Sequence, residues 1–368
     1  MFKSKRTIAL LLVMVMMISA LAGCGGKTEE SKAPASSAPS GGTPSSSAPQ
    51  AGTTEVKPEV VYQINCTQSV DLFEQLQQEF AKNVTELSGG RIAFEFIPTG
   101  SIGSSTECLT ACQMGTLDFV NGGSDELGAL VPNSDWAQLP FFIKDEEQAD
   151  EVYMNGFIGE FANEQYANSG LVSVCRVTNS FRTIGLKEGG VESSEDLKGL
   201  RIRVPNQPLA LRMYELMGAL PVAIAAPEVL MALEQGTIDG ADNAFILFDK
   251  FNQLDSFESI VLLNYGYGTI NIFCSAETWE AMPAEDQEIM LEAGLKAREW
   301  YTAERLAQQD KLIEELKNSG KTVIEPDEKW TAEMMANAAT IWDEALASGK
   351  YDPDFIQQLY ALYQENTK

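Results

Sequence analysis

Two hydrophobic periods alternate along the first two thirds of the folded part of the chain. Apolar residues at helical spacing predict helices, and short runs in which apolar residues alternate or cluster predict strands. The expected helices cover 72–87, 104–115, 208–218 and 227–235, and the expected strands cover 92–96, 117–120, 200–204, 220–224 and the residues from Thr237 onward. Strands that alternate with helices are typical of an α/β fold with a largely parallel sheet.

Two segments of the chain match each other residue for residue. ECLTACQMGTLD (107–118) and EVLMALEQGTID (228–239) share Glu, Leu, Ala, Gly, Thr and Asp at a constant offset of 121 positions. We interpret this match as an internal duplication, which predicts two similar α/β lobes. A cleft between two such lobes is the expected place for a ligand.

The last third of the chain has a helical pattern. No proline interrupts 284–318, and Gly294 is the only glycine there, so 283–318 is expected to form one long helix. At the rise of an α-helix this segment would be roughly 54 Å long, which is enough to lie across both lobes. Two further helices are expected at 330–346 and 354–363.

The N-terminus has the pattern of a bacterial export signal. Three basic residues precede an apolar run over 8–21, which is too short for a comfortable transmembrane helix. The run ends in Leu-Ala-Gly-Cys24, which resembles a lipobox, so we expect 1–23 to be removed and Cys24 to carry two acyl chains. The alternatives are an uncleaved anchor or a plain signal peptide. Residues 25–58 are rich in Ser, Ala, Pro, Gly and Thr and are expected to form a flexible tether.

Composition removes several classes of function. The chain has 26 Lys and Arg against 53 Asp and Glu, and its net charge of −27 argues against nucleic acid or an anionic membrane surface as a partner. It contains no His, which excludes Ser-His-Asp and Cys-His nucleophiles and His-ligated metal sites. We predict neither a cofactor nor a metal site. The five cysteines after the lipobox are odd in number and lack C-x-x-C spacing, so buried free thiols are expected.

Six segments of this sequence are similar to one known family. They are SGGRIAFEFIPTGSIG (88–103), QMGTLDF (113–119), LPFF (139–142), SSEDLKGLRIRVPN (193–206), PEVLMALEQGTIDGADN (227–243) and ETWEAMPAEDQEIM (277–290). Together they resemble the substrate-binding subunit of tripartite ATP-independent periplasmic (TRAP) transporters, of the dicarboxylate-binding-protein family. The resemblance covers about 300 residues, from Val60 to the end of the sequence.

The resemblance implies a periplasmic-binding-protein-like α/β fold. Its two similar α/β lobes are joined by crossing strands and enclose a ligand cleft, and a long helix spans both lobes. Lobe I is expected to contain 59–178 and about 265–305. Lobe II is expected to contain 179–264 and about 306–368.

The resemblance also implies that an arginine pairs with a carboxylate ligand. The position that matches the family's arginine, in the strand after D-L-K-G-L, is Arg203. A guanidinium offers a planar, bidentate fork to a carboxylate. Arg201 has the same strand parity and is the competing candidate. Relatives often supply a second arginine shortly before this element, which Arg182 in NSFRT fits best and for which Arg176 is the alternative.

Four further residues are candidates for the ligand site. Asn243 closes the motif I-D-G-x-x-N, and Asn65 ends the first strand, where relatives place polar contacts. Asp125 lies with Glu126 just past another strand end, where it either accepts hydrogen bonds from ligand hydroxyls or an amine or points at solvent. This acidic pair replaces the Glu-x-x-Arg pattern of the sialic-acid-binding branch and argues against that ligand. Trp136 either lines the wall of the cleft or belongs to the core.

The function indicated by these features is solute binding rather than catalysis. We expect a lipoprotein on the outer face of the cytoplasmic membrane or in the periplasm, which captures an organic-acid anion and delivers it to the membrane subunits of a TRAP transporter. The alternatives are the receptor of an ATP-driven importer or a sensor, an extracellular hydrolase that uses paired carboxylates, and a purely structural surface lipoprotein. The sequence contains no G-x-x-x-x-G-K-[ST] loop, so the chain itself is not an ATPase of that type.

Overall fold

The computed structural model describes residues 57–154, 156–189 and 191–367, without the side chains of Asp125 and Ala129. The predicted signal peptide, Cys24 and nearly all of the predicted tether lie outside the described residues. No described helix combines the length and the apolar character that are needed to cross a bilayer.

The first α/β unit follows the predicted alternation closely. It contains β1 (Val60–Cys66), α1 (Asp71–Leu87), β2 (Ile92–Ile97), α2 (Ser105–Gln113) and β3 (Phe119–Gly123), and its parallel strands lie in the order β2-β1-β3. A capping box begins α2, as the Ser-x-x-Glu spacing of Ser104 and Glu107 predicts: the Ser104 hydroxyl accepts the Glu107 amide, and the Glu107 carboxylate accepts the Ser104 amide.

The second α/β unit repeats this arrangement. It contains β5 (Arg201–Val204), α5 (Pro208–Leu216), β6 (Leu220–Ala223), α6 (Val229–Glu234) and β7 (Gly240–Ala244), with parallel strands in the order β6-β5-β7. Pro208 occupies the first turn of α5, as its fixed φ favours.

The two matching sequence segments form the same local structure. Asp118 accepts the backbone amide of Gln63 at 2.8 Å, and Asp239 accepts that of Arg201 at the same distance. Each carboxylate thereby holds the end of its own segment against the first strand of its unit. Gly115 and Gly236 both have positive φ, which lets the chain turn sharply from the helix toward the next strand. The duplication inferred from sequence therefore extends to the hydrogen bond that joins each segment to the first strand of its unit.

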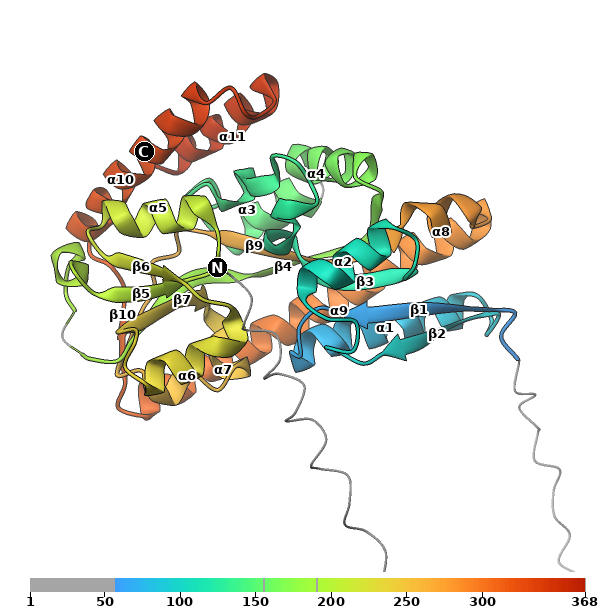
Figure 1. Ribbon diagram of the computed structural model, residues 1–368, viewed down its shortest axis with the longest axis horizontal. Coiled ribbons are helices and arrows are strands. Elements are labelled where there is room, and N and C mark those ends of the chain that lie inside the picture. Colours follow the sequence, from blue (N-terminus) through green and yellow to red (C-terminus); the bar gives the residue numbers. More distant parts are fainter. Residues whose placement is uncertain (1–56, 155, 190, 368) are drawn as a thin grey trace, which may run out of the picture. The chain divides into compact units, whose positions relative to one another are not determined.

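Two long strands connect the units and make the sheet mixed. β4 (Leu171–Leu186) and β9 (Tyr267–Ser275) pair antiparallel at its centre, and the strand order is β2-β1-β3-β9-β4-β7-β5-β6 (Figure 1). The expectation of a largely parallel sheet is wrong here, because β9 also runs antiparallel to β3, and β4 antiparallel to β7. β4 was not predicted because most of it is buried without regular alternation, which removes the period-2 signal of a half-buried strand.

Shorter elements complete the fold. They are η1 (Ser124–Ala129), η2 (Ser134–Gln138), α3 (Glu146–Ala149), η3 (Asp150–Met154), α4 (Phe157–Asn168), η4 (Ser194–Leu197), η5 (Ala226–Glu228), α7 (Phe245–Lys250), η6 (Leu254–Ser256), β8 (Ser259–Val261), α8 (Ala276–Ala281) and β10 (Thr322–Ile324). Apart from α4, these elements have three to six residues, which are too few positions to show a period, and they were not predicted.

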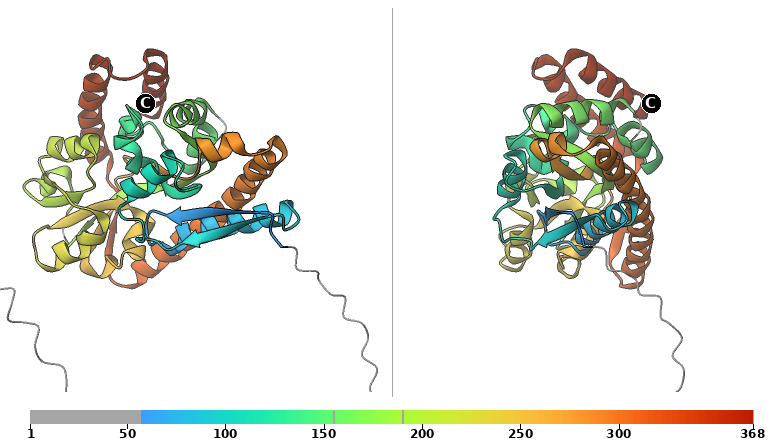
Figure 2. Two further views of the ribbon diagram at one scale, coloured as in Figure 1. Left: turned by 45° about the vertical axis from the view of Figure 1, so that its right-hand side comes forward. Right: turned by 90° about the vertical axis from the view of Figure 1, so that its right-hand side faces the viewer.

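The predicted long helix is confirmed as α9 (Ala284–Asn318). Its 35 residues pack against α1 of the first unit, against β4 and against α7 of the second unit (Figures 1 and 2). Arg91 pairs with Asp286 near its start, and the buried Arg305 pairs with Glu146 of α3. The predicted fold class, with two similar α/β lobes and a long helix across both, is therefore confirmed.

The two C-terminal helices are also confirmed, as α10 (Glu328–Ala347) and α11 (Pro353–Asn366). They contact both units, because α10 packs on α5 while the ring of Phe355 on α11 stacks on Phe161 of α4 at 3.6 Å. The Trp342 indole N–H also donates to the carbonyl oxygen of Pro140. The predicted lobe boundaries thus stay an interpretation, since α10 and α11 are shared between the two halves.

The five cysteines after Cys24 are buried free thiols, as predicted. Burial raises the pKa of Cys66 to about 12 and that of Cys175 to about 12. The thiolate is the reactive form, so these side chains are inert at neutral pH.

Gly294 gives a test of how α9 is joined to the central strand. A Cβ atom on Gly294 would lie 1.9 Å from the carbonyl oxygen of Val174 on β4, and the Cys175 thiol donates to the Gly294 carbonyl at 3.3 Å. We expect Gly294→Ala to lower the free energy of unfolding by about 1–3 kcal/mol, measured by urea denaturation, because helix and strand must separate.

Helix propensity alone gives the opposite sign, since alanine stabilises an exposed helix position by about 1 kcal/mol relative to glycine. Leu295→Ala is the matched control on the same helix, because Leu295 is 51% exposed and its truncation should change stability little. A Gly294→Ala protein as stable as the wild type would contradict the close packing described.

Candidate functional site

A cleft lies at the carboxyl ends of the parallel strands of both units. Its volume is about 1360 Å³. Residues at or just after the end of each strand line it, including Thr67, Thr99 and Glu126 in the first unit and Pro205, Ala225 and Asn243 in the second. Open α/β sheets bind ligands at this edge, because loops after neighbouring strands converge there.

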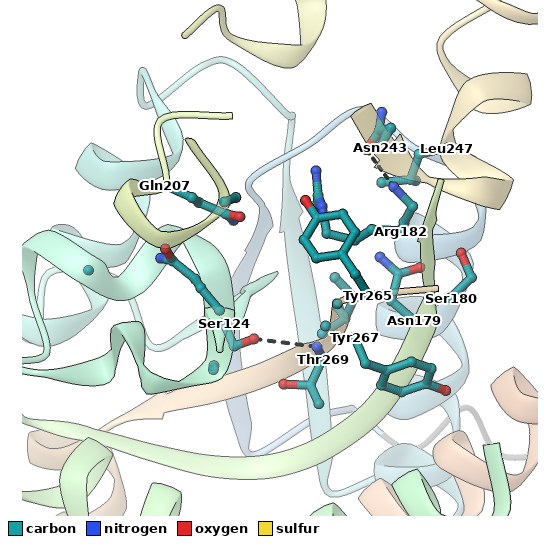
Figure 3. A pocket seen from close by; sticks show the side chains of 18 of the residues that line it. Ser124, Asn179, Ser180, Arg182, Gln207, Asn243, Leu247, Tyr265, Tyr267 and Thr269 are labelled. Atoms are coloured by element: carbon teal, nitrogen blue, oxygen red, sulfur yellow. Dashed lines mark hydrogen bonds between the residues drawn. The ribbon is translucent and has the colours of Figure 1, made fainter. Parts of the chain in front are cut away.

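The cleft continues into a smaller inner cavity of about 60 Å³ beside the crossing strands. Residues 265–270, at and before the start of β9, form one wall of this cavity. Figure 3 shows Gln207 and Ser124 on one side of it and Arg182, Asn179 and Asn243 on the other. Arg182, Gln207 and Asn243 line both spaces, which makes the inner cavity the deep end of the cleft.

Arg203 lies in the cleft near the carboxyl end of β5 and is only 3% exposed. Its Nε donates to the carbonyl of Ile224 at 2.7 Å, and one terminal nitrogen donates to the carbonyl of Asp242 at 2.9 Å. Both of these acceptors are backbone carbonyl oxygens, which help to fix the orientation of the guanidinium. A buried guanidinium of this kind is suited to a carboxylate.

Arg182 lines the cleft next to the crossing point and forms an ion pair with Asp242. Asp242 is fully buried and also accepts hydrogen bonds from the hydroxyls of Tyr214, at 2.6 Å, and Tyr265, at 2.9 Å. Burial and the Asp242 charge raise the pKa of Tyr214, so this hydroxyl keeps its proton and acts as a donor. Arg182 therefore presents a fixed donor whose charge is shared with a protein carboxylate.

Asn243 contributes an amide to the same region of the cleft. Its side-chain oxygen accepts the Ala244 amide at 3.0 Å, which leaves its Nδ2 as the donor that can face a ligand. Nδ2 is buried, and no acceptor among the described residues contacts it. The buried oxygens of Asn179 and Gln138, which line the inner cavity, likewise have no donor partner there.

The first unit supplies Glu126 rather than a second cation. The Glu126 carboxylate accepts hydrogen bonds from the Thr67 hydroxyl, the Gln68 side-chain amide and the Gly123 backbone. The sequence pattern predicts Asp125, the neighbour of Glu126, as the contact. Asp125 lies in η1, and its side chain is not among those described. The sequence feature that could have identified Glu126 is its position three residues after Gly123, which lets its side chain fold back and cap η1.

Four of the candidate ligand-contacting residues predicted from the sequence do not line the cleft. Asn65 is fully buried, and its amide donates to the carbonyls of Ile97 and Pro98. The Trp136 side chain packs in the core, where its ring stacks on Tyr153. The two alternative arginines, Arg201 and Arg176, have internal partners.

The position of Arg201 on β5 explains why Arg201 does not line the cleft whereas Arg203 does. Arg201 begins β5 and pairs with Asp239 at the amino end of the strand, whereas Arg203 lies two residues closer to the cleft. The two side chains share one face of the strand, so only their distance from the strand end separates them.

The fold and this cleft define the class of the protein. Two similar α/β units, joined by crossing strands and enclosing a polar cleft that contains buried arginines, form a two-lobed solute-binding protein. Comparison with known proteins supports this class. The model of the DctP family, "Bacterial extracellular solute-binding protein, family 7", matches residues 66–348. The chain belongs to this family of solute-binding proteins, which function in transport rather than as enzymes.

Individual relatives are similar over most of their length. The C4-dicarboxylate-binding protein DctB of Bacillus subtilis (strain 168) is 27% identical over 284 residues, which cover 76% of this chain and 79% of the relative. The 2,3-diketo-L-gulonate-binding periplasmic protein YiaO of Escherichia coli (strain K12) is 23% identical over 249 residues, or 67% and 75% of the two chains.

Solved structures have the same fold. A TRAP periplasmic solute-binding protein from Sulfitobacter sp. NAS-14.1 with bound β-D-galacturonate matches with a TM-score of 0.74 and 21% identity, covering 83% of this chain and 99% of the other. One from Haemophilus influenzae RdAW with bound L-gulonate has a TM-score of 0.75 and 22% identity, covering 82% and 99%.

Substitution of Asp242 tests how much its buried contacts with Arg182 and the two tyrosines stabilise the fold. We expect Asp242→Asn to lower the free energy of unfolding by about 3–5 kcal/mol, because Arg182 would keep its charge without the buried carboxylate that balances it. Urea denaturation measures this loss.

Tyr214→Phe removes one hydrogen bond to the same carboxylate but leaves the ion pair, so a smaller loss of about 1.5–3 kcal/mol is expected. Equal stability of Asp242→Asn and the wild type would contradict the role assigned to this carboxylate.

Proposed function

We propose that this protein captures an organic-acid anion outside the cytoplasm and delivers it to the membrane subunits of a TRAP-type secondary transporter. The observation that carries the proposal is the buried guanidinium of Arg203, held by two carbonyls at the strand edge where a ligand lies. Two relatives are named as binding proteins for a C4-dicarboxylate and for 2,3-diketo-L-gulonate, which are both carboxylates and support the same chemistry.

Arg203 is the proposed anchor for the ligand carboxylate. Its fork would bind the two oxygens with charge-assisted hydrogen bonds, which are strong where water is excluded. Arg182 and the Nδ2 of Asn243 line the same deep end of the cleft and are the proposed additional donors. Together they offer a carboxylate more donors than one guanidinium supplies.

The two-lobed architecture supports capture by closure. Glu126 and the other first-unit residues face Arg203 and Asn243 of the second unit across one cleft, so a ligand between them would contact both units. A ligand that contacts both units favours the closed state by the extra contacts it makes there. We propose that the transporter recognises this closed, ligand-bound form.

The N-terminal sequence supports attachment to the membrane surface. We propose that residues 1–23 are removed and that Cys24 is lipidated, with 25–58 as a tether between the membrane and the folded part. This arrangement places the cleft on the outer face of the cytoplasmic membrane or in the periplasm.

Removal of the Arg203 guanidinium tests this function. We expect Arg203→Ala to weaken binding of the best organic acid from a screened panel by about a hundredfold, because two charge-assisted hydrogen bonds together stabilise a complex by about 3 kcal/mol. Isothermal titration of purified protein measures the affinity, after a thermal-shift screen of organic acids and neutral sugars.

Arg201→Ala is the matched control, because it removes the same side chain two positions earlier on β5, outside the cleft. It should leave affinity unchanged. Arg203→Lys keeps the charge but loses the fork, so an intermediate loss is expected. Circular dichroism and urea denaturation establish that each variant is folded. Unchanged carboxylate affinity in folded Arg203→Ala, or thermal shifts only from neutral sugars, would overturn the proposal.

A further inference from the structure

Tyr267, the first residue of β9, belongs to the wall of the inner cavity. Only 3% of the residue is exposed, and its ring packs edge-on against Phe181 of β4 with 4.6 Å between the ring centres. Figure 3 shows its hydroxyl pointing away from the other labelled side chains. This hydroxyl donates to Glu146, which does not line the cavity. The ring, rather than the hydroxyl, is therefore the part of Tyr267 that faces the cavity.

The hydroxyl of Tyr267 is held by a chain of contacts that leads away from the site. Burial and the nearby Glu146 charge raise the pKa of Tyr267, so the hydroxyl keeps its proton and donates it to Glu146, the first residue of α3. The two oxygens of Glu146 accept hydrogen bonds from the guanidinium of Arg305 at 3.2 and 2.7 Å. Arg305 is fully buried on α9. An ion pair between α3 and the long helix thus fixes the carboxylate that holds Tyr267.

Backbone pairing alone does not fix the direction of the ring. Tyr267 pairs with Phe181 in the ladder of β4 and β9, next to a register shift between Thr178 and Phe181. Strand pairing fixes the backbone, but a tyrosine side chain can still adopt several staggered rotamers. The contact of the hydroxyl with Glu146 and the contact of the ring with Phe181 select one of them.

The inner cavity has room for a small group only. Its volume of about 60 Å³ corresponds to roughly four to six water-sized atoms, since one water needs about 10–15 Å³ by this measure. Arg182 and Asn243 line both the cleft and the cavity, whereas Tyr267 lines the cavity alone. A ligand that extends inward from the cleft therefore passes these two side chains before it reaches the Tyr267 ring.

We infer that the ion pair of Glu146 with Arg305 holds the Tyr267 ring in place, and that this ring limits the length of the organic acid that the site accepts. The inference rests on the proposed anchoring of the ligand carboxylate at Arg203, from which the rest of the ligand extends into the inner cavity. Tyr267 determines this specificity directly. Glu146 and Arg305 are positioning residues, because they act on the ligand only through the Tyr267 ring.

Homologous acids that differ only in chain length test this inference. The probes are the unbranched 2-oxo acids from pyruvate to 2-oxooctanoate and the unbranched dicarboxylates from succinate to suberate. In isothermal titration of the wild-type protein, affinity should fall by about tenfold or more at one step of a series, because the added CH₂ group meets the ring. Tyr267→Ala removes the ring, so affinity should instead rise by about fourfold for each of the next two CH₂ groups.

Two further variants test the positioning role. Tyr267→Phe keeps the ring but removes its contact with Glu146, so the ratio of affinities across the length limit should fall by about threefold. Glu146→Gln removes the ion pair with Arg305 and should lower the ratio in the same direction. If Glu146 and Arg305 only stabilised the fold, urea denaturation would show a loss of stability while this ratio stayed unchanged.

Tyr301→Phe is the matched control for Tyr267→Phe. Tyr301 is fully buried on α9, one turn before Arg305, and its hydroxyl has no hydrogen-bond partner among the described residues. Its loss should leave the ratio of affinities across the length limit within about twofold of the wild type.

The outcomes separate the two proposals. If no carboxylate binds, or if binding does not depend on Arg203, the proposed function fails and this inference fails with it. If acids bind through Arg203 but neither series shows a length limit, or Tyr267→Ala leaves the limit in place, only the inference fails. Should Tyr267→Ala fail to fold, Tyr267→Leu takes its place, because it also removes the ring, and an unchanged limit there overturns the inference. The positioning role fails if Tyr267→Phe and Glu146→Gln leave the ratio unchanged, or if Tyr301→Phe lowers it equally.

Discussion

The antiparallel pairing of β4 with β9 is the constraint on which the position of the site depends. Phe181 pairs with Tyr267 in this ladder, and the next residue, Arg182, pairs instead with Ala244 of β7. The chain therefore passes from one half of the sheet to the other at Arg182. Because residues 265–270 lie beside the same point, the inner cavity forms where the two units meet. A ligand bound there would contact both units, as the proposed closure requires.

Features with a strong local pattern could be predicted from the sequence. The capping box of Ser104 and Glu107, the long helix α9 and the repeated helix ends all depend on residues close together in the chain. The family resemblance indicated Arg203 as the anchor, and Arg201, on the same face of β5, was the competing candidate. Strand parity could not separate the two, because the position of Arg201 depends on Asp239, which lies 38 positions away and pairs with it. In the structure Arg203 lines the cleft and Arg201 does not.

Features that depend on contacts between distant segments could not be predicted. Nothing near Asp242 in the sequence indicates that it is fully buried between Arg182 and two tyrosines. Asn65 lies next to a strand end, as expected for a ligand contact, but its side-chain amide donates to the carbonyl of Ile97 at the end of β2. Trp136 has cleft-lining neighbours on both sides, yet its own ring packs inward. In each case the partner that decides the role of the side chain belongs to another element of the fold.

A protein with a net charge of −27 must attract an anion by short-range contacts rather than by its overall field. Salt weakens the long-range repulsion, since charges farther apart than about 10 Å interact little at 0.1 M ionic strength. Inside the cleft Arg203 donates to two backbone carbonyls, and Arg182 pairs with Asp242. Both guanidinium groups line the cleft, so they are the positive charges that an anion would meet at short range.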